Sequence, residues 1–212
     1  MTARRSVDVA VAGVALVMLA PLLLIVALAV RLTSPGGALF RQRRVGRGGR
    51  PFMLLKFRTM RDGAGGPSVT RAGDARVTPL GAVLRRWKVD ELPQLVNVLR
   101  GDMSLIGPRP EVPDYLAQAG AAGAAYAAVQ PGLADAATLA YYDEADVIAR
   151  ATDPERYYVD VILPEKIRLS VAYARERAFG SDLRLLWALA RRIAGFGPPR
   201  PAWRNPRVEA RR

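Results

Sequence analysis

The chain has 212 residues, which is enough for one globular domain with attachments. It contains no cysteine and no histidine, which excludes disulfides, thiolate catalysis, and the commonest general base and transition-metal ligand. Any metal would therefore be a hard ion on oxygen ligands, such as Mg²⁺. A formal charge of +13, from 32 Lys and Arg against 19 Asp and Glu, favours a polyanionic partner: nucleic acid, an anionic membrane or a phosphorylated substrate.

Residues 9–30 carry no charge, and a bilayer-spanning helix needs about 20 apolar residues. Arginines stand on both sides of this run, and because basic residues mark the cytoplasmic side, a straight span would put one flank on the wrong side. Pro21 removes a backbone donor and can kink the helix, so both flanks could stay on one side. We predict a re-entrant helix within residues 1–34. A straight span, and a signal peptide cleaved near Ala27-Leu28-Ala29, are the alternatives.

The rest of the chain predicts a catalytic domain over 35–195 and a disordered Pro/Arg-rich tail over 196–212. Extended segments at 38–40 and 52–57 around a Gly/Arg loop indicate a short β-hairpin, and the Gly-rich stretch 61–79 indicates a lid or a disordered loop. Helices are expected at 80–87, 93–99, 117–129, 164–179 and 182–193. The fold class is α+β: a small, mostly helical domain with a short β-hairpin, attached by the N-terminal re-entrant, Pro-kinked membrane helix and by amphipathic interfacial helices.

Two of these helices show an apolar face. In the helix at 93–99, the face consists of Leu92, Leu95, Val96 and Leu99, and Gly101 stands where a C-terminal cap belongs. The last helix has an apolar stripe formed by Leu183, Leu186, Trp187, Ala190 and Ile193. Such a stripe suits a membrane surface, although packing on the core is its more frequent use.

Asp90 and Glu91 form an acidic pair in this basic chain. Pro93 disfavours helical geometry at Leu92, so the pair is expected at or just before a helix N-terminus, where carboxylates and phosphates are stabilised. The surrounding sequence supplies cations at Arg85, Arg86, Lys88, Arg100 and Arg109. An ionised aspartate can attack phosphorus, with Mg²⁺ and arginines neutralising the charge of a diphosphate. The plainer alternative is that the pair caps a helix and pairs with nearby arginines.

Two further cations and one constrained arginine complete the predicted site. Lys56 and Arg58 end a candidate strand, which is a common place for residues that face a ligand. Arg109 lies between Pro108 and Pro110, so its backbone is restricted and its planar fork can bind a phosphate bidentately.

At these residues the sequence resembles a known family. "KFRTM" at 56–60 and "DELPQLVNVLRGDMSLIGPRP" at 90–110 closely resemble the catalytic signature of the bacterial monotopic phosphoglycosyl transferases, or bacterial sugar transferases. The resemblance implies transfer of a phospho-sugar from a nucleotide sugar, usually a UDP-sugar, to a polyprenol phosphate such as undecaprenyl phosphate. It implies release of UMP, and a place on the cytoplasmic face of the bacterial inner membrane.

The resemblance also implies roles for particular residues. Asp90 would be the nucleophile that forms a covalent phospho-sugar intermediate and would help hold Mg²⁺. Glu91 would be its acidic partner, and Lys56, Arg85 and Arg109 would contact phosphates or carboxylates. Pro21 matches the helix-breaking proline of the family.

The second half departs from the family pattern. The segment 130–144, "QPGLADAATLAYYDE", keeps Pro131-Gly132 but little else, and Ser170 stands where a family aspartate is expected. These differences concern sugar and nucleotide recognition rather than phosphoryl transfer. The rival interpretations are a non-catalytic basic module that binds anionic lipid or nucleic acid, and a family fold that has lost activity. No nucleic-acid motif is present, and a homodimer is left open.

Overall fold

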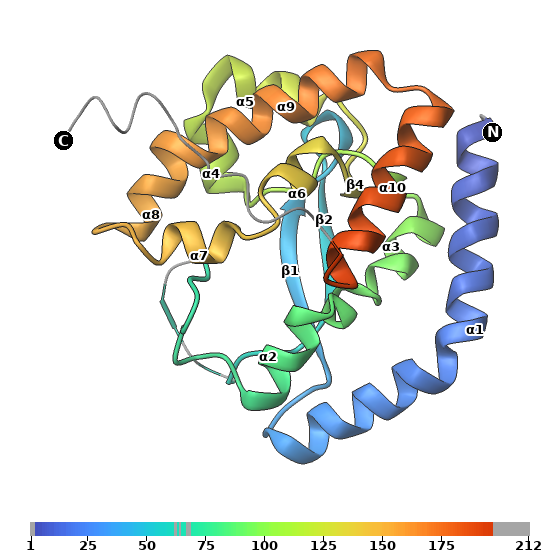
Figure 1. Ribbon diagram of the computed structural model, residues 1–212, viewed down its shortest axis with the longest axis vertical. Coiled ribbons are helices and arrows are strands. Elements are labelled where there is room, and N and C mark those ends of the chain that lie inside the picture. Colours follow the sequence, from blue (N-terminus) through green and yellow to red (C-terminus); the bar gives the residue numbers. More distant parts are fainter. Residues whose placement is uncertain (1–2, 62, 64, 67–68, 197–212) are drawn as a thin grey trace.

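A computed structural model describes residues 3–61, 63, 65–66 and 69–196 (Figure 1). The predicted tail lies almost entirely outside these residues, as does part of the predicted lid. The helices in chain order are α1 (Ala3–Thr33), α2 (Pro79–Arg86), α3 (Gln94–Arg100), α4 (Pro113–Gln118), α5 (Gly120–Ala127), α6 (Ala136–Ala140), α7 (Glu144–Ile148), α8 (Pro154–Tyr157), α9 (Leu163–Glu176) and α10 (Phe179–Ile193). The α+β class is confirmed.

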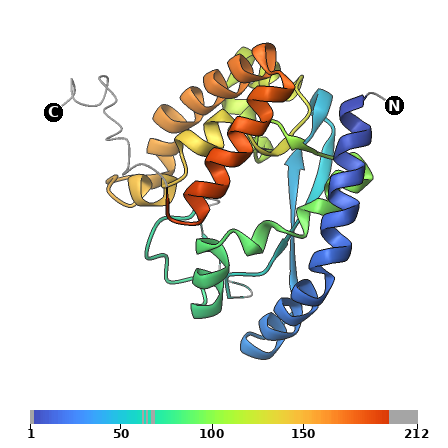
Figure 2. The ribbon, with the colours of Figure 1, turned by 45° about the vertical axis from the view of Figure 1, so that its right-hand side comes forward.

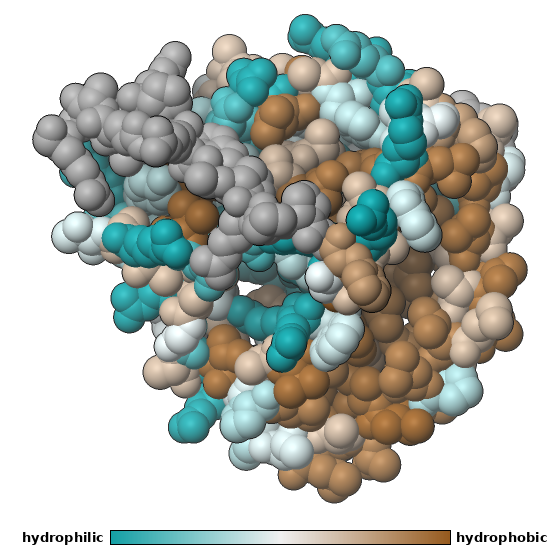
Figure 3. All heavy atoms as spheres, in the orientation of Figure 1, coloured by the Kyte–Doolittle hydropathy of each residue, from teal (hydrophilic) through white to brown (hydrophobic). Residues whose placement is uncertain are grey.

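The N-terminal helix α1 contains Pro21 and bends near its middle (Figure 1). It is long and apolar enough to cross a membrane, and only 11% of its most apolar window is buried. Its outer side forms a continuous hydrophobic surface (Figure 3). Both arms nevertheless pack on the folded domain: Ala12 joins a cluster with α3, and Val26 and Val30 join one with Phe57. The predicted boundary at residue 34 is therefore crossed by core packing.

Strands β1 (Leu39–Val45) and β2 (Pro51–Phe57) form an antiparallel hairpin, with Leu39 opposite Phe57 and Val45 opposite Pro51. In the turned view of Figure 2 the hairpin stands between α1 and the helices α9 and α10. The hairpin was predicted, but β1 was expected to end at residue 40. The arginines that suggested a loop belong to the strand, where Arg41 and Arg43 are exposed to solvent and Arg44 is partly buried.

Helix α3 ends as predicted, with Gly101 in a left-handed conformation. Its predicted apolar face is wrong in part, because Leu99 is exposed and Asn97 is fully buried. The Asn97 side chain accepts a hydrogen bond from Leu55 N at 3.0 Å and donates one to Met53 O at 2.8 Å. A buried amide thus joins α3 to β2.

Two short strands were not predicted. β3 (Ser104–Ile106) and β4 (Gly132–Ala134) pair in parallel, which brings the departing second half against the Gly-Pro-Arg-Pro turn. A Cβ on Gly107 would lie 2.4 Å from Gln130 O, and one on Gly132 would lie 2.2 Å from Gly107 N. Both glycines are required by this close approach of backbones.

The second half contains the largest core cluster, built from α4, α5, α9 and their connections around Ile148, Ile162 and Leu163. The single helix expected at 117–129 is two helices, because the chain turns at Gly120 with a φ of +53°. A π-helical turn (Tyr158–Ile162) joins α8 to α9, so helix starts well before the predicted residue 164. The apolar stripe of α10 is exposed at Leu183, Leu186 and Trp187 rather than packed on the core.

Candidate active site

Asp90 and Glu91 lie in a 3₁₀ turn, η2 (Val89–Glu91), between α2 and α3. This confirms the position predicted from Pro93, although Leu92 is itself in the right-handed helical region. Leu92 tolerates that geometry because successive tight turns satisfy the backbone: Leu92 N donates to Val89 O at 3.2 Å, and Leu95 N donates to Leu92 O at 3.1 Å. The two carboxylates differ in their partners, because Glu91 binds two cations while an oxygen of Asp90 has no hydrogen-bond partner among the described residues.

Glu91 is paired with two predicted cations. Arg109 donates to both of its oxygens, at 2.9 Å and 2.5 Å, and Lys56 Nζ lies 3.4 Å from Oε1. Burial alone would raise the pKa of Glu91, but the charges of Arg109 and Lys56 hold it well below its usual range. Glu91 is therefore ionised, and it fixes the fork of Arg109 in a bidentate pair.

Lys56, on β2, contacts the same carboxylate, Glu91, that Arg109 binds. Burial and the nearby positive charge of Arg109 lower the pKa of Lys56 to about 8, against the opposing charges of Glu91 and Asp90. The charged form of Lys56 is therefore destabilised by its surroundings in the free protein. A bound anion would favour the protonated lysine.

Asp90 has a different environment. It is only 5% exposed, and its Oδ1 is buried without a hydrogen-bond partner among the described residues. Burial raises the pKa of Asp90 and the neighbouring charge of Glu91 raises it further, while Lys56, Lys88 and Arg109 oppose the rise. A buried carboxylate oxygen without a donor is unusual in a folded protein and marks a position suited to a positively charged or electrophilic ligand.

The loop that carries Arg109 is held from several sides. Tyr126 donates its hydroxyl to Arg109 O at 2.5 Å, Gly132 N donates to Pro108 O at 2.8 Å, and Arg44 donates to Pro110 O at 3.0 Å. The sequence linked the segment 130–144, which includes Pro131-Gly132, to sugar and nucleotide recognition and gave it no contact with the Arg109 loop. Its contribution is to support this loop through the parallel β3–β4 pair.

The two remaining predicted cations are placed differently. Arg85 Nε donates to Thr59 Oγ1 at 2.8 Å, and the Asp90 charge partly offsets the lowering of the Arg85 pKa by burial, so Arg85 borders the acidic pair. Arg58 is buried and donates to the carbonyls of Ser34 and Pro35, with the Ser34 contact at 2.8 Å. It ties β2 to the chain leaving α1, which is a structural contact that the sequence did not suggest. Its predicted contact with substrate is untested.

The residues present fit a Mg²⁺ ion only in combination with a ligand. The described part of the chain has no group of three or more Asp or Glu side chains arranged to hold a metal. Mg²⁺ is commonly held by one or two carboxylates together with substrate phosphates, and the unpartnered oxygen of Asp90 can supply one such ligand.

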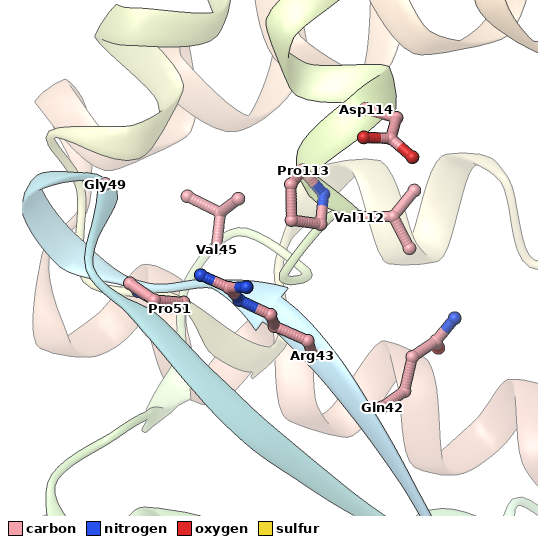
Figure 4. Close-up of a pocket in the computed structure, with 8 residues that line it drawn as sticks. All are labelled: Gln42, Arg43, Val45, Gly49, Pro51, Val112, Pro113 and Asp114. Carbon is pink, nitrogen blue, oxygen red and sulfur yellow. The ribbon is translucent and has the colours of Figure 1, made fainter.

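An open pocket of about 510 Å³ lies elsewhere, between the hairpin and the start of α4 (Figure 4). Its lining includes Gln42, Arg43, Val112 and Asp114. None of the predicted site residues lines it, so it is separate from the acidic pair.

These features define a class of protein: a small helical domain on a bent apolar helix, with an acidic pair surrounded by cations. The model of the bacterial sugar transferase family matches residues 1–195, and the chain belongs to this family.

Individual relatives agree with this assignment. A UDP-glucose:undecaprenyl-phosphate glucose-1-phosphate transferase of Caulobacter vibrioides is 58% identical over 109 residues, which are 50% of this chain and 41% of the relative. The protein of that name in Escherichia coli is 47% identical over 109 residues, or 50% and 24%. The exopolysaccharide production protein ExoY of Rhizobium meliloti is 40% identical over 148 residues, or 62% and 66%. The matches thus cover between 24% and 66% of the length of these relatives.

Proposed function

We propose that this protein transfers a phospho-sugar from a UDP-sugar to undecaprenyl phosphate at the membrane, through a covalent intermediate on Asp90. The observation that carries the proposal is the unpartnered oxygen of Asp90 beside the Glu91–Arg109–Lys56 cluster. The names of the relatives from Caulobacter vibrioides and Escherichia coli supply the donor and acceptor classes.

In the first step a carboxylate oxygen of Asp90 attacks the phosphorus that carries the sugar. An O–P bond to Asp90 forms, the bond from that phosphorus to the bridging oxygen breaks, and the bridging oxygen leaves on UMP. In the second step an oxygen of undecaprenyl phosphate attacks the same phosphorus. The bond to Asp90 then breaks, which regenerates the carboxylate and completes the lipid-linked diphosphosugar.

The cations of the site would stabilise the negative charge of the phosphates. Arg109, fixed by Glu91, and Lys56 present positive charge to the phosphate oxygens without reorganisation, which is the main source of stabilisation in phosphoryl transfer. Mg²⁺, held through Asp90 and donor oxygens, would neutralise further diphosphate charge when bound. Because Asp90 is 5% exposed, donor binding has to move the side chains that cover it.

The bent helix supports attachment with both ends on one face of the membrane, which we assign to the cytoplasmic face of the inner membrane. Near its start, Arg5 donates to Leu99 O at 2.8 Å, and Asp8 accepts from Ser104 Oγ at 2.6 Å. Beyond its end, Arg58 binds Ser34 O. Both ends of α1 therefore lie on the same folded domain, as a re-entrant helix requires.

The reaction is tested with purified protein, Mg²⁺, undecaprenyl phosphate and a panel of UDP-sugars, by measuring UMP release. Asp90→Asn should abolish release and also abolish a phospho-sugar mass adduct on the peptide containing residue 90. Asp160→Asn, at an exposed carboxylate, is the matched control and should behave as wild type. Wild-type turnover by Asp90→Asn would disprove the covalent step, and absence of UMP release from every donor would disprove the transferase activity.

Topology is tested separately. Because the chain has no cysteine, Ala3→Cys and Gly37→Cys can each be labelled without background. Both positions are exposed; Ala3 is the first residue of α1, and Gly37 follows its end. An impermeant thiol reagent should reach both from the cytoplasmic side of inverted vesicles, and labelling from opposite sides would establish a simple span.

A further inference from the structure

Lys88 adopts an unusual backbone conformation immediately before the acidic pair. Its φ is +57°, the only positive value at a non-glycine position among the described residues. The left-handed region is unfavourable for an ordinary side chain, because its Cβ crowds the following carbonyl oxygen. Lys88 nevertheless closes this turn: its N donates to Arg85 O and its carbonyl accepts from Glu91 N, both at 3.2 Å. The turn sets the direction in which Asp90 and Glu91 leave α2.

The side chain of Lys88 has a specific partner in the departing second half. Its Nζ lies 5.2 Å from the centroid of the Tyr142 ring, within the range of a cation–π contact. Arg192, in the last turn of α10, lies 5.3 Å from the centroid of the same ring and pairs with the Asp143 carboxylate. Tyr142 is thus the point where the acidic turn, the segment after α6 and the end of α10 meet.

The ring lies within electrostatic reach of the acidic pair. Burial raises the pKa of Tyr142, and the negative charges of Asp143 and Glu91 raise it further. Two cations already lie over the ring, so it is occupied by protein groups rather than available as a stacking surface for a base or sugar. What the ring can do is hold Lys88.

We propose that Tyr142 is a positioning residue for phospho-sugar transfer: its ring holds the Lys88 side chain, and thereby the left-handed turn that presents Asp90 and Glu91. This inference rests on the proposed function. It also explains why a lysine occupies a position where glycine would cost less, because glycine would supply the backbone conformation without the anchor.

The first test compares Tyr142→Ala with Tyr142→Phe in the full-length protein, using UMP release as the readout. Loss of the ring should lower kcat roughly tenfold, the value of a partly desolvated cation–π contact, with the KM for the UDP-sugar within about twofold. Phenylalanine keeps the ring and should retain at least half of the wild-type kcat. A ring needed only for folding would lower the amount of folded protein and leave kcat per folded molecule unchanged.

A second pair of variants guards against misfolding of Tyr142→Ala. Lys88→Gly relieves the backbone but removes the cation, whereas Lys88→Arg keeps the cation. We expect a roughly tenfold loss of kcat for glycine and near wild-type activity for arginine. The double variant Lys88→Gly/Tyr142→Ala should be no worse than either single variant, because both changes break the same contact.

The outcomes are distinct. Wild-type kcat in Tyr142→Ala or Lys88→Gly, equal losses in Tyr142→Phe and Tyr142→Ala, or additive losses in the double variant would each overturn the positioning role while leaving the transferase intact. A wild-type protein that releases no UMP from any UDP-sugar would instead overturn the proposed function, and the positioning role with it.

Discussion

The pKa values of two lysines in this molecule, the partly buried Lys56 and the buried Lys166, are shifted in opposite directions by their surroundings. Lys56, in the candidate site, contacts Glu91 at 3.4 Å beside Arg109, and burial together with that arginine lowers its pKa to about 8. Lys166, on α9, lies 2.7 Å from Glu144 and 3.7 Å from Glu111. Burial opposes the charge of Lys166, but the two carboxylates outweigh it and raise its pKa.

The difference indicates that the Lys166 cluster has a structural role, whereas the Lys56 cluster belongs to the candidate active site. The Lys166 cluster is closed, with the Tyr158 hydroxyl also donating to Glu111 at 2.6 Å, so its charges satisfy one another. The cluster around Lys56 has more cations than its one well-ionised carboxylate can balance, and an oxygen of Asp90 beside it has no partner. Such an imbalance is costly in the free protein and is relieved by a bound anion.

The largest effect on stability should come from removing Lys166 from its ion pairs with Glu111 and Glu144. Lys166→Met removes the cation of the partly buried Glu144 and one of the two cations of the buried Glu111, which keeps Arg44 at 3.7 Å, so the free energy of unfolding should fall by about 3 kcal/mol. Denaturant unfolding in detergent measures the change. Arg168→Ala, which breaks an exposed ion pair with Glu165, is the control and should cost below about 0.5 kcal/mol. A Lys166→Met protein as stable as wild type would mean that the cluster has no structural role.

Arg109→Lys tests the cluster of Glu91, Arg109 and Lys56 in the candidate site. Lysine keeps the charge but cannot make the two parallel bonds to Glu91, so the rate of UMP release should drop about 10²–10³-fold, typical of losing one oriented transition-state donor. Stability should change little by comparison with Lys166→Met. Activity within tenfold of wild type would show that the charge alone, without the bidentate geometry, is sufficient.

Asp8 connects α1 to β3, the strand that precedes the Arg109 loop of the candidate site. Its carboxylate accepts from Ser104 Oγ at 2.6 Å and from Leu105 N at 3.1 Å, on the strand that leads to Arg109. Asp8→Ala leaves these buried donors unpaired and should cost about 1–3 kcal/mol of unfolding free energy. Asp8→Asn keeps one acceptor and should lose less, so equal losses in the two variants would argue against these hydrogen bonds.

The smallest effect concerns pH. Lys56 has a pKa of about 8, lowered from its ordinary value, so raising the pH through 8 removes its charge from the free protein. The kcat/KM for the UDP-sugar should therefore fall by about fivefold between pH 8 and pH 9. In Lys56→Arg this alkaline decline should disappear, since arginine stays protonated. An unchanged decline in that variant would assign it to another group.

Local patterns predicted much of the first half of the fold. Gly101 marked the end of α3, and the short apolar run before residue 57 marked β2. The errors share one cause, which is that tertiary contacts decided the outcome. The Ala-rich run 117–129 carries no sign that Gly120 turns, and three-residue strands such as β3 and β4 have no periodicity to detect.

The contacts of the candidate site likewise include some that local sequence motifs predicted and some that depend on the tertiary fold. Lys56, Glu91 and Arg109 were predicted together because they stand in recognisable motifs, and the structure joins them. The contact between Lys88 and Tyr142 could not be predicted, because the pairing depends on how the second half folds back. A positive φ at a lysine is likewise invisible in sequence, since the turn is imposed by its neighbours.

The burial of Asp90 has a consequence for fidelity. An acyl phosphate is an activated species that bulk water destroys, and each such loss would waste a sugar donor. In the proposed mechanism, a carboxylate that is 5% exposed would form this bond away from bulk solvent, so the intermediate would persist until the lipid acceptor arrives. Such shielding suits the proposed reaction, in which the acceptor lipid would reach the site by lateral diffusion in the bilayer.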